Sequence, residues 1–177
     1  TITGSGTTWT ARKTMDNHTD PEGQVTFSVN FSDQSGNQGV SVTSTTDNSI
    51  VRFDKTSPTA ALSYSAPGPY RQGETVTITA YYNESMLTTS TPRLKVILED
   101  GTSVSEIMNW ASGMDNRSSF DFLMRSGNGI AEVKLDDALD LTGNEVIPDP
   151  TEGGQFELDN IPPSAFISYQ DGTGSPY

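Results

Sequence analysis

The sequence contains no cysteine and only one histidine, His18, among its 177 residues. The first absence excludes disulfide bonds and thiolate metal sites. A single histidine excludes metal sites built from several histidines, and it has no serine or cysteine nucleophile motif that it could serve as a base. No apolar run approaches the roughly 20 residues that a membrane-spanning helix needs. Lysine and arginine total 10 against 23 acidic residues, so the net charge is −13. Because so acidic a chain repels the phosphates of nucleic acids, we expect no nucleic-acid partner.

The chain has little hydrophobic content, 32%, and many turn-forming residues, with 16 glycines and 10 prolines. Apolar and polar residues alternate in several short segments, which is typical of strands with one buried face. We expect strands at 8–13, 24–31, 40–45, 50–53, 61–64, 75–81, 93–98, 119–124, 130–135 and 155–158. Residues 104–114 fit either a strand or a single helical turn. The pattern predicts an all-β fold of the sandwich type.

The sequence repeats itself. Residues 53–64, FDKTSPTAALSY, return 105 residues later as 158–169, LDNIPPSAFISY, and residues 33–37, DQSGN, return 107 residues later as 140–144, DLTGN. A fixed period of this length indicates an array of similar modules.

The repeat divides the chain into three segments. Residues 1–54 are expected to be the C-terminal half of one module, 55–159 a complete module, and 160–177 the start of a third. Tyr64 recurs as Tyr169 and Tyr70 as Tyr177, so these tyrosines are expected to pack in the cores.

Four segments resemble a known family: EGQVTF at 22–27, DQSGN at 33–37, FDKTSPT at 53–59 and GETVTITA at 73–80. They are similar to the bacterial immunoglobulin-like (Big-type) tandem repeats of large cell-surface and adhesin proteins. The resemblance implies tandem immunoglobulin-like β-sandwich modules with a period of about 105 residues, an extracellular location and no catalytic activity. Some relatives bind calcium near module junctions. The chain departs from the family pattern at Asn83, where the family has serine, and at Ile161, where the first copy has a linker threonine.

An immunoglobulin-like topology would bring one linker and two loops of the complete module to the same end. Calcium prefers six to eight oxygen ligands, which acidic and amide side chains can supply. The candidates are Asp54, Glu84, Asp136, Asp137, Asp140 and Asn144. The alternative is a structural loop, because the Asp-x-Ser/Thr-Gly-Asn pattern is by itself favourable turn chemistry. The equivalent Asp33, Asn37 and Asp159 lack half of their modules, and we expect any metal there to be weakly held.

The sequence therefore predicts a non-catalytic structural spacer of an extracellular surface, adhesin or filament-forming protein, with calcium (Ca²⁺) at the joints. The alternative function is binding of a carbohydrate or host surface through exposed aromatic residues, with Tyr82 and Trp110 as candidates. The expected partners are neighbouring modules of the same chain, and a surface glycan under the second interpretation. The segment 160–177 could also pair with residues 1–54 of another copy, since unpaired strand edges seek partners. The simpler alternative is that the sequence is an excised piece of a longer chain.

Overall fold

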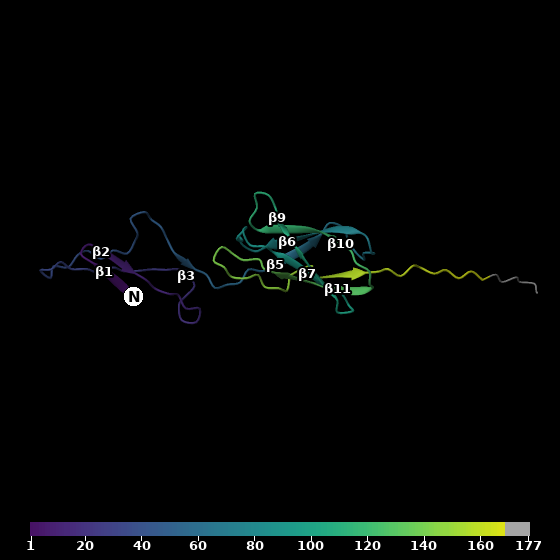
Figure 1. Cartoon of the computed structure of the whole chain (residues 1–177), viewed down its shortest axis with the longest axis horizontal. Coiled ribbons are helices and arrows are strands. Elements are labelled where there is room, and N and C mark those ends of the chain that lie inside the picture. Colours follow the sequence, from purple (N-terminus) through teal and green to yellow (C-terminus); the bar gives the residue numbers. More distant parts are fainter. Residues whose placement is uncertain (169–177) are drawn as a thin grey trace, which may run out of the picture.

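The computed structural model describes residues 1–168, which form two units joined by a linker at 54–59 (Figure 1). We call residues 1–53 the first unit and residues 60–160 the second unit. Every regular element in the described residues is a β-strand, so the predicted all-β class is confirmed. No helix within 1–168 is long and apolar enough to cross a membrane.

The second unit consists of two four-stranded antiparallel sheets whose inner faces meet in one core. The first sheet has the order β5 (Ala60–Tyr64), β6 (Thr75–Tyr82), β10 (Arg117–Leu123), β9 (Asn109–Trp110). The second has the order β12 (Gln155–Leu158), β11 (Gly129–Asp136), β7 (Arg93–Ile97), β8 (Ser103–Ile107). The ambiguous segment 104–114 thus contains most of β8, the short β9 and a turn.

Alternation along the strands builds the core, because successive side chains point to opposite faces of a sheet. β6 buries every second residue, and β7 and β11 do the same from the facing sheet. Tyr70, Phe122 and Phe156 fill the space between the sheets, with Tyr64 partly buried beside them. The core positions predicted for Tyr64 and Tyr70 are confirmed, whereas Tyr169 and Tyr177 lie outside the described residues.

The first unit contains four short strands: β1 (Ile2–Ser5), β2 (Thr8–Ala11), β3 (Gly23–Gln24) and β4 (Arg52–Phe53). β1 pairs with β2, and β3 with β4. The strands predicted at 24–31 and 40–45 are largely wrong. These two segments, which we call the two arms, lie between β3 and β4 and pair only at isolated bridges such as Val29 with Val42. No residue of 1–54 is buried, so no second layer holds these arms in regular strands.

Replacement of a core leucine tests this division between inner and outer faces. Leu135 on β11 is 0% exposed, whereas Leu123 on β10 is 53% exposed. Leu135→Ala should lower the free energy of unfolding by about 2–5 kcal/mol, through lost burial and the cavity left behind. Leu123→Ala, the matched control, should change it by less than about 0.5 kcal/mol. Urea unfolding monitored by tryptophan fluorescence measures both, and equal losses would contradict the assigned faces.

Candidate metal centre at the joint between the units

Asp140 anchors a tight turn after β11 and is 1% exposed. Its Oδ1 accepts hydrogen bonds from the Thr142 backbone N–H (2.7 Å), the Thr142 hydroxyl (2.8 Å) and the Asn144 N–H (2.9 Å). Its Oδ2 accepts one from Asn144 Nδ2 at 2.8 Å. Burial raises the pKa of Asp140, but the bonds donated by Asn144 and Thr142 outweigh it and leave the pKa below its usual value. The buried carboxylate is therefore ionised at neutral pH.

The same turn occurs in the first unit at Asp33. There Oδ1 accepts from the N–H groups of Ser35 (2.9 Å) and Asn37 (2.8 Å), and Oδ2 accepts from Asn37 Nδ2 at 2.8 Å. Gly36 and Gly143 occupy the same place in the two turns with φ of 89° and 96°, a region that glycine enters at little steric cost. Asp33 is exposed and still forms the turn. The turn therefore forms without neighbouring acids. The copy at Asp140 differs from the copy at Asp33 in the acidic side chains that surround it.

The linker is fastened to the two loops at this end of the second unit. Asn144 Nδ2 also donates to the Asp54 carbonyl at 3.3 Å. Asn83, in the loop after β6, accepts from the Thr59 N–H at 2.8 Å and donates its own N–H to the Thr59 carbonyl at 3.0 Å. Because both loops hold the linker, their side chains are brought to the point where the chain enters the unit.

Three carboxylates meet at this point. Asp54 from the linker, Glu84 from the loop after β6 and the buried Asp140 each offer an oxygen, and these oxygens lie within 4.8 Å of one another. No lysine, arginine or histidine of residues 1–168 forms an ion pair with any of the three. Burial raises the pKa of Glu84, and the negative charges of Asp140, Asp54 and Glu22 raise it further. Calcium prefers carboxylate oxygens of this kind, and the group offers three of the six to eight oxygen ligands that the ion takes.

The first unit contributes a fourth acid, Glu22, which the sequence analysis missed. Its Oε2 accepts a hydrogen bond from the hydroxyl of the linker residue Thr56 at 2.9 Å. Next to it, Lys55 Nζ donates to the backbone carbonyls of Asn17 (3.0 Å) and Asp20 (3.3 Å). The repeat shows which positions of two modules are equivalent, but it does not show which residues of one unit contact the next unit. No signal in one sequence therefore marks Glu22 as a neighbour of Glu84.

The predicted ligands separate into two groups. Asp54, Glu84, Asp140 and Asn144 come together as described above. Asp137 instead forms an ion pair with Arg93 (Oδ2 to Nε, 3.2 Å), and Asp136 is the β11 residue directly opposite Arg93 in the ladder with β7. Neither belongs to the group of acids within 4.8 Å, so the structure does not support their assignment as ligands.

The exposed aromatic platform predicted at Tyr82 and Trp110 is wrong for Tyr82. Tyr82 is 4% exposed, and its hydroxyl shares a hydrogen bond with Ser118 Oγ at 3.0 Å. Trp110 is partly buried with its ring centroid 5.5 Å from that of Tyr82, and its indole N–H donates to a backbone carbonyl. The neighbouring Tyr81 faces solvent instead, with the Arg117 guanidinium 4.6 Å from its ring centroid. These contacts weaken the carbohydrate-binding alternative.

His18 faces solvent. Its side chain is 96% exposed, and Nδ1 lies 3.7 Å from Asp16 Oδ1. No other titratable side chain of the described residues forms an ion pair with it. His18 therefore belongs to a surface loop rather than to a site.

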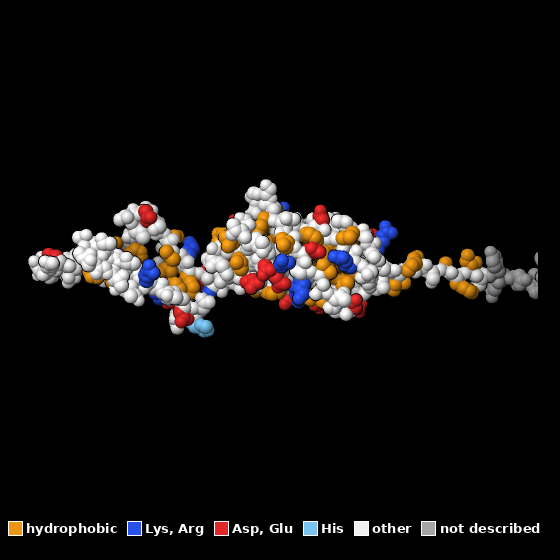
Figure 2. Space-filling view, viewed as in Figure 1, with side chains coloured by type: hydrophobic (Ala, Val, Ile, Leu, Met, Phe, Trp, Pro, Cys, Tyr) orange, Lys and Arg blue, Asp and Glu red, His pale blue; other side chains and the backbone are white. Residues whose placement is uncertain are grey.

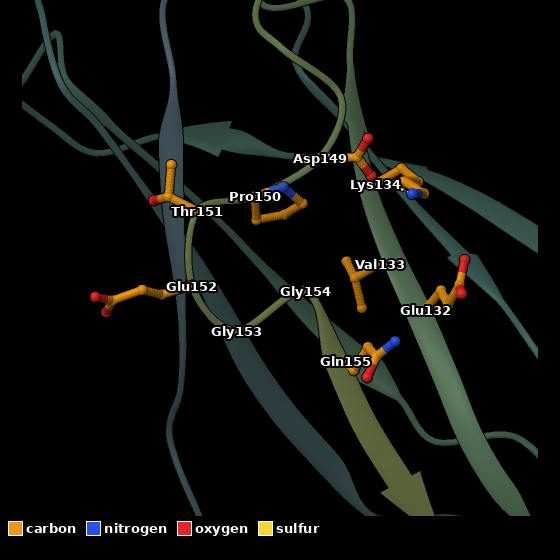
Figure 3. Close-up of a pocket in the computed structure, with 10 residues that line it drawn as sticks. All are labelled: Glu132, Val133, Lys134, Asp149, Pro150, Thr151, Glu152, Gly153, Gly154 and Gln155. Atoms are coloured by element: carbon orange, nitrogen blue, oxygen red, sulfur yellow. Dashed lines mark hydrogen bonds and ion pairs between the residues drawn. The ribbon is translucent and has the colours of Figure 1, made fainter.

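A polar hollow of about 470 Å³ lies between β11 and the segment 149–155 (Figure 3). Lys134 and Asp149 form an ion pair at its rim, while the side chain of Glu152 points away from them. The charged side chains that line the hollow therefore either neutralise each other, as Lys134 and Asp149 do, or point away from it, as Glu152 does. The three acids at the linker remain the group with unbalanced charge.

The sequence matches no protein-family model and no curated protein. The functional interpretation therefore rests on the residues of the joint.

Glu84→Gln tests whether the acids repel one another when no cation is supplied. The raised pKa means that folded Glu84 keeps a proton which the unfolded chain has released above about pH 4.5. Stability in EDTA should therefore fall as the pH rises from there through the folded pKa. The variant should lack this fall, and relief of about 0.5 kcal/mol of repulsion at pH 7 should raise Tm by about 3 °C.

Thermal melting in EDTA between about pH 4 and pH 8 provides the measurement. Glu157→Gln is the matched control, because Glu157 is an exposed residue of β12 outside the acidic group. A Glu84→Gln protein that is less stable than the wild type at pH 7 would show that the carboxylate is held by favourable contacts rather than repelled.

Proposed function

We propose that this chain is part of a non-catalytic spacer, built from tandem immunoglobulin-like modules and stiffened by calcium at the joints. The observation that carries the proposal is the meeting of Asp54, Glu84 and Asp140 where the linker enters the second unit. Three acids from separate segments cost free energy when they are placed together without a cation. A divalent ion bound there would neutralise them and fix the linker to both loops.

The strand order of the second unit supports an immunoglobulin-like assignment. If the strands are lettered from β5 as A and β6 as B, β9 and β10 become D and E, and the first sheet reads A-B-E-D. The second sheet reads G-F-C with one further strand, β8, at its edge. This order agrees with that of the two sheets of immunoglobulin-like domains, which supports the proposed assignment.

The tandem arrangement is supported by hydrogen bonds that recur with the sequence. The turns at Asp33 and Asp140 each accept bonds from the N–H groups two and four residues later. Asp54 in the linker and Asp159 after β12 also match each other, because each accepts a hydrogen bond from the N–H group two residues later at 3.0 Å. Matching local structure at both sequence echoes is expected of consecutive modules.

The mechanism of such a spacer is mechanical. A flexible linker alone would allow the two units to change their relative orientation. An ion bound by both the linker and the loops would restrict that motion. Glu22 lies near the same acids and hydrogen-bonds to the linker, so the first unit would also be fixed in orientation. We propose an extracellular location, because open sites of this kind bind calcium with Kd values near the millimolar levels found outside cells.

Calcium should stabilise the wild-type protein. With a Kd of about 0.1–1 mM, typical of extracellular sites, about 10 mM calcium adds roughly 1.4–2.7 kcal/mol by mass action. Thermal melting in calcium against EDTA should therefore show a clear rise in Tm. Glu84→Gln and Asp54→Asn should lose most of this rise.

The control variant Glu157→Gln should retain the full response to calcium. Isothermal titration should give about one bound ion per joint, and the same two variants should weaken it. An unchanged melting temperature in calcium, or equal responses from Glu84→Gln and Glu157→Gln, would rule out a calcium site at these acids.

A further inference from the structure

One arginine of the second unit has no acidic partner. The unit contains four arginines, and three of them form an ion pair with a carboxylate: Arg71, Arg93 and Arg125. Arg117, the first residue of β10, forms no ion pair within residues 1–168. The chain has 23 acidic residues against 10 basic ones, so an arginine without a carboxylate is unusual. The guanidinium of Arg117 therefore carries a positive charge that the described residues leave unmatched.

The side chain of Arg117 is held in place on the outer face of the first sheet. Arg117 is directly opposite Tyr81 of β6, and its guanidinium carbon lies 4.6 Å from the centre of the Tyr81 ring. Its Nε atom is buried without a hydrogen-bond partner, whereas its two terminal nitrogens are not buried in this way and face solvent. A guanidinium fixed against a ring presents an oriented pair of N–H groups, which reduces the entropy lost on binding.

This arrangement costs the folded chain free energy. A buried N–H without an acceptor costs more than a stack on a partly exposed ring returns, and Tyr81 is 42% exposed. An unsatisfied group of this kind requires an explanation in a folded protein. A ligand that uses the same guanidinium provides one.

Hydroxyl and amide side chains lie beside this pair. Residues two apart on a strand share a face of the sheet, so Thr79 follows Tyr81 on this face. Thr79 is directly opposite Ser119 of β10, and Ser119 is opposite Asn109 of β9. A row of polar groups that can both donate and accept hydrogen bonds therefore runs next to the arginine.

The chemistry of this face selects the kind of partner. A guanidinium binds both oxygens of a carboxylate through two parallel hydrogen bonds. Hydroxyl and amide side chains bind the hydroxyl groups that sugars carry. A protein partner would instead need an apolar centre of contact, and Tyr81 is the one large apolar side chain in the two rows that contain Arg117 and Ser119. The face thus fits a sugar that carries a carboxylate.

The surrounding charge favours a ligand with a single negative group. The net charge of −13 repels polyanions. On the face seen in Figure 2, lysine and arginine side chains are scattered and form no basic patch. Asp121 lies on the same face of β10, about 13 Å further along the strand, and accepts a hydrogen bond from the Thr77 hydroxyl at 2.7 Å. One guanidinium in such surroundings matches one carboxylate on an otherwise neutral glycan.

We propose that Arg117 and Tyr81 bind a glycan that ends in one carboxylate-bearing sugar. The terminal nitrogens of Arg117 would hold the carboxylate, while Tyr81 and the hydroxyls of Thr79 and Ser119 contact the sugar. The site shares no residue with the aromatic platform expected from the sequence or with the acids of the joint. It goes beyond the spacer function and does not require calcium.

NMR titration of the isotope-labelled wild-type chain in EDTA tests the proposal. The probes are sialyllactose and methyl glucuronide, and the methyl ester of each is its neutral match. At least one of the two acids should shift the amide signals of β6 and β10 around Arg117 with a Kd of about 1–10 mM. Its ester should bind at least about tenfold more weakly, because it loses the ion pair with the guanidinium.

Variants test which residues hold the sugar. Arg117→Gln should remove the difference between acid and ester, and Tyr81→Leu should weaken binding of the acid. Arg125→Gln is the matched control, because the charge of Arg125 is already paired with Glu106, and it should bind like the wild type. The amide spectrum of each variant reports its folding, and the comparison of acid with ester needs only the wild-type chain.

Four results would overturn the proposal. They are no shift with either acid, an ester that binds as tightly as its acid, wild-type binding by Arg117→Gln, and tighter binding of an acetylated peptide with one glutamate than of either sugar. The last result would identify a protein partner instead of a glycan.

Discussion

The structure of the joint depends on one buried charge, the carboxylate of Asp140. Four hydrogen bonds from its own turn keep it ionised at 1% exposure. Those bonds also orient Asn144, whose amide reaches the Asp54 carbonyl and so ties the linker to the turn. Burial, together with the negative charges of Asp140, Asp54 and Glu22, raises the pKa of Glu84 and so makes its ionised form unfavourable at this position. The proposal of a cation site rests on this geometry rather than on the number of acids in the chain.

The first unit shows what the same turn does without such neighbours. Asp33 makes the equivalent bonds in an exposed position, and the arms around it hold only isolated bridges. A turn motif therefore sets a local shape, while the packed sheets decide whether its acid is buried beside other acids. In a tandem array, the proposed cation sites would therefore lie only at joints where the turn belongs to a module with two packed sheets.

Much of the second unit could be predicted from its sequence, because strict alternation identifies strands such as β6 and β11. The expected immunoglobulin-like topology, which the family resemblance implied, placed one linker and two loops at the same end. The same logic brought Asp54, Glu84 and Asp140 together. It failed at Tyr82, although parity with the buried Val76, Ile78 and Ala80 places that side chain inside. It also failed in the first unit, where alternation at 24–31 yields no continuous strand without a facing sheet. Glu22 could not be predicted, since contacts between units leave no periodic signal.

The central claim is that a divalent ion at the joint fixes the two units relative to each other. The chain has no native cysteine, so Gln24→Cys and Ser126→Cys can carry a pair of spin labels, one in each unit. Pulsed dipolar spectroscopy then measures the distribution of distances between them. The account predicts one narrow distribution in calcium and a broad one in EDTA. The same distribution under both conditions would contradict it.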